Sequence, residues 1–285
     1  MNRTKTPKRS VTRSLLQRIA AAPYLFWAVL FIIIPLIFVA YYSFTDRSFA
    51  FTLENIKAIF TPKYLTILGR SVKLALIATA ICLLIGYPAA YFIARTNPKK
   101  QKILIMLIML PMWMNFLIRT YAWMVLLQDT GIINSLLGTI GIGPLKLMYT
   151  EGAVVVGMVY DYLPYMILPI YSIMTKLDNR LVEAASDLGC NPFAVIRKVV
   201  IPQSIPGVIS GIMMVFVPSI STFYISQKLG GGNFYLIGDA IETQFNSNNL
   251  HMAAAISFVL MVILLAGMFV MDKFSDNSSG GGLMP

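Results

Sequence analysis

Six long apolar runs constrain the fold of this 285-residue chain more than any other feature of its sequence. A helix needs about 20 mostly apolar residues to cross the hydrocarbon core of a bilayer. Runs of this length cover residues 23–44, 72–94, 103–127, 152–175, 204–226 and 252–271. Only 12% of the residues are charged, against about 25% in soluble domains. The pattern predicts an all-α membrane protein with six transmembrane helices in one bundle.

The distribution of lysine and arginine predicts the orientation of the six spans. Basic residues are more frequent in the N-terminal tail and in the segments after the second, fourth and sixth runs than in the other connecting segments. Because such residues concentrate on the cytoplasmic side, both termini are expected to be cytoplasmic. Residues 1–21 would form a basic tail, 22–272 the six-span transmembrane domain and 273–285 a disordered, Ser/Gly-rich tail.

The net charge of +11 is scattered over the tail and short loops. This scatter favours contact with anionic membrane lipid and disfavours nucleic acid as a partner. The sequence contains one histidine, two cysteines and no G-x-x-x-x-G-K-[ST] phosphate-binding loop. With so few histidines and cysteines and no phosphate-binding loop, the sequence predicts no metal site, no cofactor and no catalytic residues. The chain is therefore expected not to be an enzyme.

A polar segment at residues 178–202 interrupts the apolar pattern. Asp178 and Asn191 are suited to cap helix starts, Pro192 suits a first helical position, and Gly189 suits a left-handed helix end. The segment is therefore expected to form two short cytoplasmic helices joined by a glycine turn, with Pro202 at the entry to the fifth span. Its apolar stripe, of which Leu181 is part, lies either against the underside of the bundle or in the cleft of a soluble partner.

The same segment carries a motif that resembles the loop of bacterial ABC importer permeases. Glu183-Ala184-Ala185, three residues, Gly189, nine residues and Val199-x-Ile201-Pro202 match E-A-A-x3-G-x9-I-x-L-P with two conservative departures. The resemblance implies a MetI-like bundle with cytoplasmic coupling helices in a bacterial cell membrane. It also implies that this loop docks onto a separate ATPase subunit. The docking residues that it implies are Glu183, Ala184, Ala185, Gly189 and Pro202.

Further segments resemble the permeases for spermidine and putrescine within that family. They are residues 86–91, 117–123, 159–160, 163–171, 176–178, 223–224 and 229–231. The resemblance implies import of a polyamine by alternating access, with an ATPase homodimer, a second homologous permease and an extracytoplasmic substrate-binding protein as partners. Permeases for iron, sulfate and thiamine share this architecture and remain alternatives. A stand-alone secondary transporter with proline-broken helices is a further alternative, although such a carrier needs no docking loop.

Two charged residues lie within the predicted spans, where ionisable groups are costly and usually face a partner or a cavity. Arg119 lies toward the outer end of the third span and Asp161 lies within the fourth. They either pair with each other, or Asp161 meets a cationic substrate among aromatic rings. The candidates for a translocation path are Trp113, Tyr121, Trp123, Tyr160, Asp161 and Tyr165. Separately, Gly207 and Gly211 predict close helix packing in the fifth span.

Overall fold

The described part of the chain, residues 22–279, is helical in the computed structural model, and it contains no strand beyond one isolated bridge between Thr45 and Phe51. Its helical elements, with η marking π- or 3-10 turns, are η1(Val29–Ile33), α2(Ile34–Ser43), α3(Glu54–Ile59), α4(Pro62–Ala94), α5(Pro98–Met109), η2(Leu110–Trp113), α6(Phe116–Leu127), α7(Ile132–Thr139), α8(Glu151–Met174), α9(Asn179–Asp187), α10(Pro192–Val195), η3(Ile196–Val200), α11(Ile201–Ser221), α12(Tyr224–Gly230), α13(Ile237–Asn246) and α14(Leu250–Ser279). The basic tail expected over residues 1–21 lies outside the described residues.

Five helices are long and apolar enough to cross a membrane. They are Ala22–Ser43, Pro62–Ala94, Glu151–Met174, Pro192–Ser221 and Leu250–Met271, and a sixth span results if the bent pair Pro98–Trp113 and Phe116–Thr139 is counted as one. The all-helical class and five of the six expected spans are therefore confirmed, and the third run is the exception. α14 continues to Ser279, so the first part of the tail that we expected to be disordered is helical.

Small residues allow α4, α8 and α11 to pack closely at the centre of the bundle. A Cβ added at Gly211 of α11 would lie 2.8 Å from the sulfur of Met166 and 3.1 Å from its carbonyl oxygen. A Cβ at Gly207 would lie 3.0 Å from the carbonyl oxygen of Pro169. The close packing predicted from these two glycines is confirmed, and it resembles the small-residue contacts typical of membrane helices.

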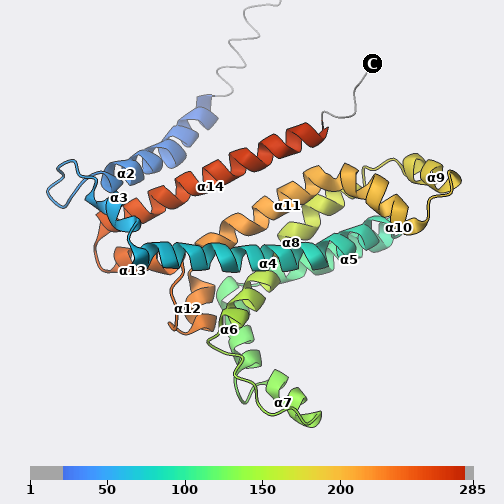
Figure 1. Ribbon diagram of the computed structural model, residues 1–285, viewed down its shortest axis with the longest axis horizontal. Coiled ribbons are helices and arrows are strands. Elements are labelled where there is room, and N and C mark those ends of the chain that lie inside the picture. Colours follow the sequence, from blue (N-terminus) through green and yellow to red (C-terminus); the bar gives the residue numbers. More distant parts are fainter. Residues whose placement is uncertain (1–21, 280–285) are drawn as a thin grey trace, which may run out of the picture.

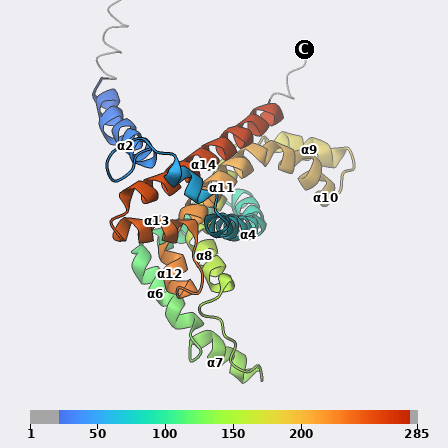
Figure 2. The same cartoon turned by 60° about the vertical axis from the view of Figure 1, so that its left-hand side comes forward.

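The third apolar run forms two helices instead of one straight span. α5 and η2 end at Trp113, α6 starts at Phe116, and the two parts are bent by 91°. Pro111 lacks the N–H that would continue the helix. The Asn115 side chain then accepts a hydrogen bond of 2.8 Å from the Leu117 N–H and so caps a new start. As a result, α6 and α7 project from the side of the bundle in both views (Figures 1 and 2).

The fifth span is longer at its start and shorter at its end than expected. Residues Pro192–Ser221 form one helix, so the second short helix of the polar segment runs directly into the span. The π-turn η3 precedes Pro202 and accommodates the backbone around a residue that cannot donate a hydrogen bond. At the other end the helix stops at Ser221 because Thr222 has an extended backbone, with ψ of 141°. α12 then begins after Phe223.

The two ends of the bundle differ in structure. α9 and α10 lie at one end, which we call the α9 end, whereas α3 and α13 lie at the other, which we call the α13 end (Figure 1). α2 packs mainly on α14 and lies apart from the core helices (Figure 2). Its side chains are almost all partly or fully exposed, which suits a helix that faces lipid or another subunit.

Candidate functional site

The polar segment forms a two-helix loop at the α9 end, and its caps are those the sequence predicts. The Asp178 carboxylate accepts a hydrogen bond of 2.9 Å from the Arg180 N–H at the start of α9. The Asn191 side chain accepts one of 2.7 Å from the Ala194 N–H at the start of α10. Between the two helices Gly189 has a φ of +80°, a conformation that favours glycine. These features fix the position of the loop relative to α11.

Large apolar side chains of this loop point away from the bundle. Leu188 is 85% exposed, Phe193 73% and Leu181 47%. The stripe expected to lie either under the bundle or against a partner is therefore not covered by this chain. Val182, in contrast, packs on the core cluster that contains Met174. We call the three exposed side chains the α9 face.

The residues of the matched motif are distributed around the same loop. Glu183 and Ala184 are exposed on α9, and Ala185 is partly buried. Gly189 forms the turn after α9 and is exposed. Pro202 is exposed but lies further along, inside the continuous helix that leads from α10 into α11. The structure thus places four of the five motif residues on α9 and the turn after it, and the fifth, Pro202, in the helix that follows.

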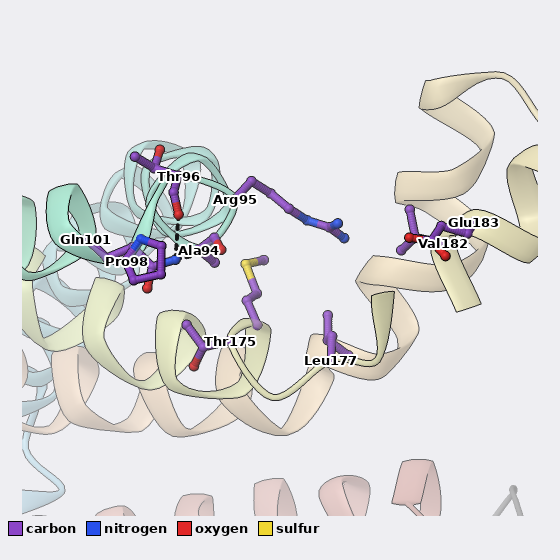
Figure 3. A pocket seen from close by; sticks show the side chains of 10 residues that line it. Ala94, Arg95, Thr96, Pro98, Gln101, Thr175, Leu177, Val182 and Glu183 are labelled. Carbon is purple, nitrogen blue, oxygen red and sulfur yellow. Dashed lines mark hydrogen bonds between the residues drawn. The ribbon is translucent and has the colours of Figure 1, made fainter. Parts of the chain in front are cut away.

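A cavity of about 600 Å3 lies beside α9. Its wall includes Val182 and Glu183 of α9, the last residues of α8, and the turn between α4 and α5. The side chain of Arg95 extends from the end of α4 toward Val182 and Glu183 (Figure 3). The loop is therefore attached to the bundle at its ends while part of its inner side remains open.

Gln101 joins three helices under this cavity, a role that sequence reasoning missed. Its side-chain amide donates hydrogen bonds to the carbonyl oxygens of Ala94, at 3.1 Å, and Thr96, at 2.8 Å. Its carbonyl oxygen accepts one of 3.1 Å from the Tyr171 hydroxyl of α8. The available signal was a neutral amide between Lys100 and Lys102, immediately before an apolar run.

Arg119 and Asp161 form a buried ion pair between α6 and α8. Arg119 Nη1 lies 2.8 Å from Asp161 Oδ1, and the two side chains are only 11% and 5% exposed. The sequence left open whether Asp161 pairs with Arg119 or meets a cationic substrate, and in this conformation Asp161 pairs with Arg119. Despite the short distance, the oxygen accepts no well-aligned hydrogen bond within the described residues, and Arg119 Nε also has no partner there.

The candidate aromatic residues do not all surround this pair. Trp123 of α6 packs edge-on against Tyr160 of α8 with ring centres 5.4 Å apart. Tyr165 lies one turn beyond Asp161 on α8, with its ring 6.5 Å from that of Tyr162. Tyr162, which the sequence analysis did not select, is partly buried and donates a hydrogen bond of 3.4 Å to the Pro218 carbonyl oxygen.

The remaining two candidates are more exposed. Trp113 is 73% exposed at the break before α6. Tyr121 is 48% exposed, and its ring centre lies 5.7 Å from the ammonium nitrogen of Lys228. Four of the five aromatic candidates therefore lie on the two helices that hold the ion pair, Tyr121 and Trp123 on α6 and Tyr160 and Tyr165 on α8, but Tyr121, like Trp113, is largely exposed.

Two acidic side chains at helix starts, Glu151 of α8 and Asp239 of α13, are engaged within the chain. Glu151 forms ion pairs of 2.5 and 3.5 Å with two basic side chains of α4. Asp239 is buried at the start of α13 and accepts hydrogen bonds from the Leu236 N–H and the Ser226 hydroxyl. Burial raises the pKa of Asp239 to about 6. In residues 22–279 no group of three His, Cys, Asp or Glu is placed to hold a metal ion.

The fold and the loop define a class of protein: a multi-span helical membrane protein with uncovered apolar side chains on a two-helix loop at one end. The family model described as "Binding-protein-dependent transport system inner membrane component" matches residues 83–277. The chain belongs to this family.

Relatives and solved structures agree with this assignment. The chain is 40% identical over 263 residues to the spermidine/putrescine transport system permease protein PotB of Haemophilus influenzae, covering 89% of this chain and 92% of the relative. It is 38% identical over 247 residues to PotB of Escherichia coli K12, covering 84% and 90%. It is also 30% identical over 257 residues to the inner membrane ABC transporter permease protein YdcU of the same organism, covering 84% and 81%.

Two solved structures share the fold. A crystal structure of a bacterial ABC transporter involved in the import of the acidic polysaccharide alginate superposes with a TM-score of 0.72, at 15% identity, over 94% of this chain and 97% of that chain. The same kind of transporter in complex with an alginate pentasaccharide-bound periplasmic protein gives 0.73, at 14% identity, over 96% and 98%. The expected ABC importer permease fold is confirmed.

Proposed function

We propose that this ABC importer permease moves spermidine or putrescine into the cytoplasm. The observation that carries the proposal is the identity of 38–40% to two PotB permeases over most of both chains. A binding site formed by a carboxylate and aromatic rings suits an alkyl chain with terminal ammonium groups. Asp161, Tyr160 and Tyr165 on α8 supply such groups.

The α9 face is the proposed docking surface for an ATPase homodimer. A permease of this family without a phosphate-binding loop needs its energy from another subunit, and Leu181, Leu188 and Phe193 are the apolar side chains that such a subunit could bury. The matched motif residues Glu183 and Gly189 lie within the same loop. Motion of the ATPase would reach the bundle through α11, which is continuous with α10.

The proposed orientation places the α9 end and both termini in the cytoplasm, because the Lys/Arg-rich segments lie there. In this arrangement residues 22–272 form the permeation domain and 178–202 the coupling loop. A second, homologous permease and an extracytoplasmic binding protein complete the importer, as the family description indicates for the latter. The scattered basic side chains meet anionic lipid, and nucleic acid is not a partner.

Reconstitution tests this function directly. We would co-express the chain with an ATPase, a second permease and a binding protein of a PotB-type system, and measure ATP-dependent uptake of radiolabelled spermidine and putrescine into proteoliposomes. Iron, sulfate and thiamine serve as competing solutes. Saturable polyamine uptake that needs all four proteins supports the proposal. Uptake of another solute alone would refute the polyamine, and uptake by this chain without an ATPase would refute the importer.

A further inference from the structure

The Arg119–Asp161 pair lies at a position where an ion pair contributes little to the net stability of the fold. Both groups are buried in the apolar part of the bundle. Removing two charges from water costs about as much as their attraction returns, so buried pairs contribute little to net stability. Ionisable residues at membrane depth more often mark a transport path.

The pair is also incompletely bonded. An arginine that holds a carboxylate through two parallel hydrogen bonds commonly uses Nε together with one Nη. Here Nη1 lies 2.8 Å from Asp161 Oδ1, but Nε has no hydrogen-bond partner within residues 22–279. A contact in which Nε takes no part is easier to exchange than one held by two parallel hydrogen bonds.

The surroundings of Arg119 already accommodate a cation. Its guanidinium carbon lies 5.8 Å from the centre of the Phe116 ring, in addition to its contact with Asp161. The Phe116 ring in turn lies 5.5 Å from that of Tyr224. A carboxylate on one side and aromatic faces on the other are the groups that bind an alkylammonium.

Two helix breaks lie on the elements around this pair. Arg119 is in the first turns of α6, just after the 91° bend, and Tyr224 begins α12 after the break at Thr222. Irregular backbone at membrane depth is tolerated where it is buried in protein or lines a cavity, and transporters place their substrate sites at such breaks. The break before α6 separates α6 from α5, so the position of α6 against α8 is not fixed by a continuous helix.

From these observations we propose that Arg119 is a resident counter-ion for Asp161 which a terminal ammonium group of the substrate displaces during transport. The inference rests on the proposed function and adds a specificity role to it. Exchange of one cation for another keeps the buried carboxylate paired throughout. When the substrate leaves, Arg119 returns and closes the site to other cations.

Four variants of the reconstituted importer test the exchange. Arg119→Gln removes the resident cation, Asp161→Asn removes the carboxylate, the double variant removes both charges with nearly unchanged shape, and Arg119→Asp/Asp161→Arg reverses them. Glu151→Gln is the matched control, because Glu151 lies on the same helix as Asp161, α8, but at the surface. The measurements are complex assembly by size-exclusion chromatography and KM for spermidine uptake.

The exchange predicts opposite effects of the single variants. Asp161→Asn should raise KM at least tenfold, whereas Arg119→Gln should lower it severalfold and raise ATP hydrolysis in the absence of substrate. The double and reversed variants should assemble and show KM raised at least tenfold, while Glu151→Gln keeps the wild-type value.

A structural pair predicts different results. Wild-type KM in the double or reversed variant, or failure of the neutral double variant to assemble, would assign the pair to packing and overturn the exchange. Either result leaves polyamine import by the wild-type complex intact. If the wild-type complex takes up no polyamine, the proposed function itself is refuted.

Discussion

Replacement of Leu188 by alanine should weaken ATPase binding without affecting the fold. The side chain is 85% exposed on the α9 face, so its removal leaves no cavity in the bundle. If docking buries it, Leu188→Ala loses the burial of roughly three carbon groups at about 0.8 kcal/mol each. We reduce this sum to about 2 kcal/mol because the side chain is already partly covered. The expected loss of affinity is roughly 30-fold.

The assay is titration of the purified, detergent-solubilised permease pair with fluorescently labelled ATPase. Leu136→Ala is the matched control, because Leu136 is 63% exposed on α7, away from the α9 end. The control should bind the ATPase like wild type, and both variants should keep the wild-type melting temperature. Equal affinity of the two variants for the ATPase would refute the docking role of the α9 face. A lowered melting temperature of Leu188→Ala would show that the side chain packs within the chain.

Three further predictions concern packing, the coupling loop and pH. Gly211→Ala should lower the melting temperature, by an overpacking cost of about 1–3 kcal/mol, whereas Gly69→Ala, which meets no atom within 4 Å, should not. Gly189→Pro and Glu183→Lys should each abolish uptake at normal membrane levels; retained uptake would contradict the coupling role. The pKa of Asp239 is raised to about 6 in the folded protein. The contribution of Asp239 to stability should therefore be largest below about pH 4 and fall as pH rises through 6. Melting temperatures measured across this pH range should show this fall for wild type and should not show it for Asp239→Asn.

Local sequence chemistry predicted those parts of the structure that short-range interactions determine. The caps at Asp178 and Asn191 and the left-handed turn at Gly189 depend on side chains within three residues of the backbone they satisfy, so they could be derived directly. The apolar runs likewise predicted the spans, because length and hydropathy are sufficient for that conclusion.

The helix breaks were not predictable in the same way. Residues around Pro111 and Asn115 are flanked by apolar side chains, and proline is tolerated in many membrane helices. The decision between a kink and a 91° bend depends on what α6 packs against, namely α12 and α8. In the opposite sense, Pro202 was expected at the entry to the fifth span, whereas the span starts ten residues earlier because the π-turn before Pro202 keeps the helix continuous.

The candidate site was predicted only in part, because contacts between distant helices do not follow from local sequence. Arg119 and Asp161 could be singled out because charges in apolar runs are rare, but sequence alone left their pairing open. Trp113 and Tyr121 were selected as aromatic candidates for the translocation path, but both are largely exposed in this conformation. Gln101 was missed because one of its partners, Tyr171, lies 70 residues away on α8, and the carbonyl oxygens of Ala94 and Thr96 become available only where α4 ends.

The bend before α6 has a mechanical consequence. α6 is 12 residues long, or about 18 Å, and Arg119 lies about 5 Å from the bend at 1.5 Å per residue. A rotation about the bend that moves the α7 end of this arm by about 3 Å would move the Arg119 backbone by about 1 Å. A large displacement of α7 at the side of the bundle therefore becomes a smaller displacement of Arg119 relative to Asp161. That smaller displacement is still large enough to break a hydrogen bond between them.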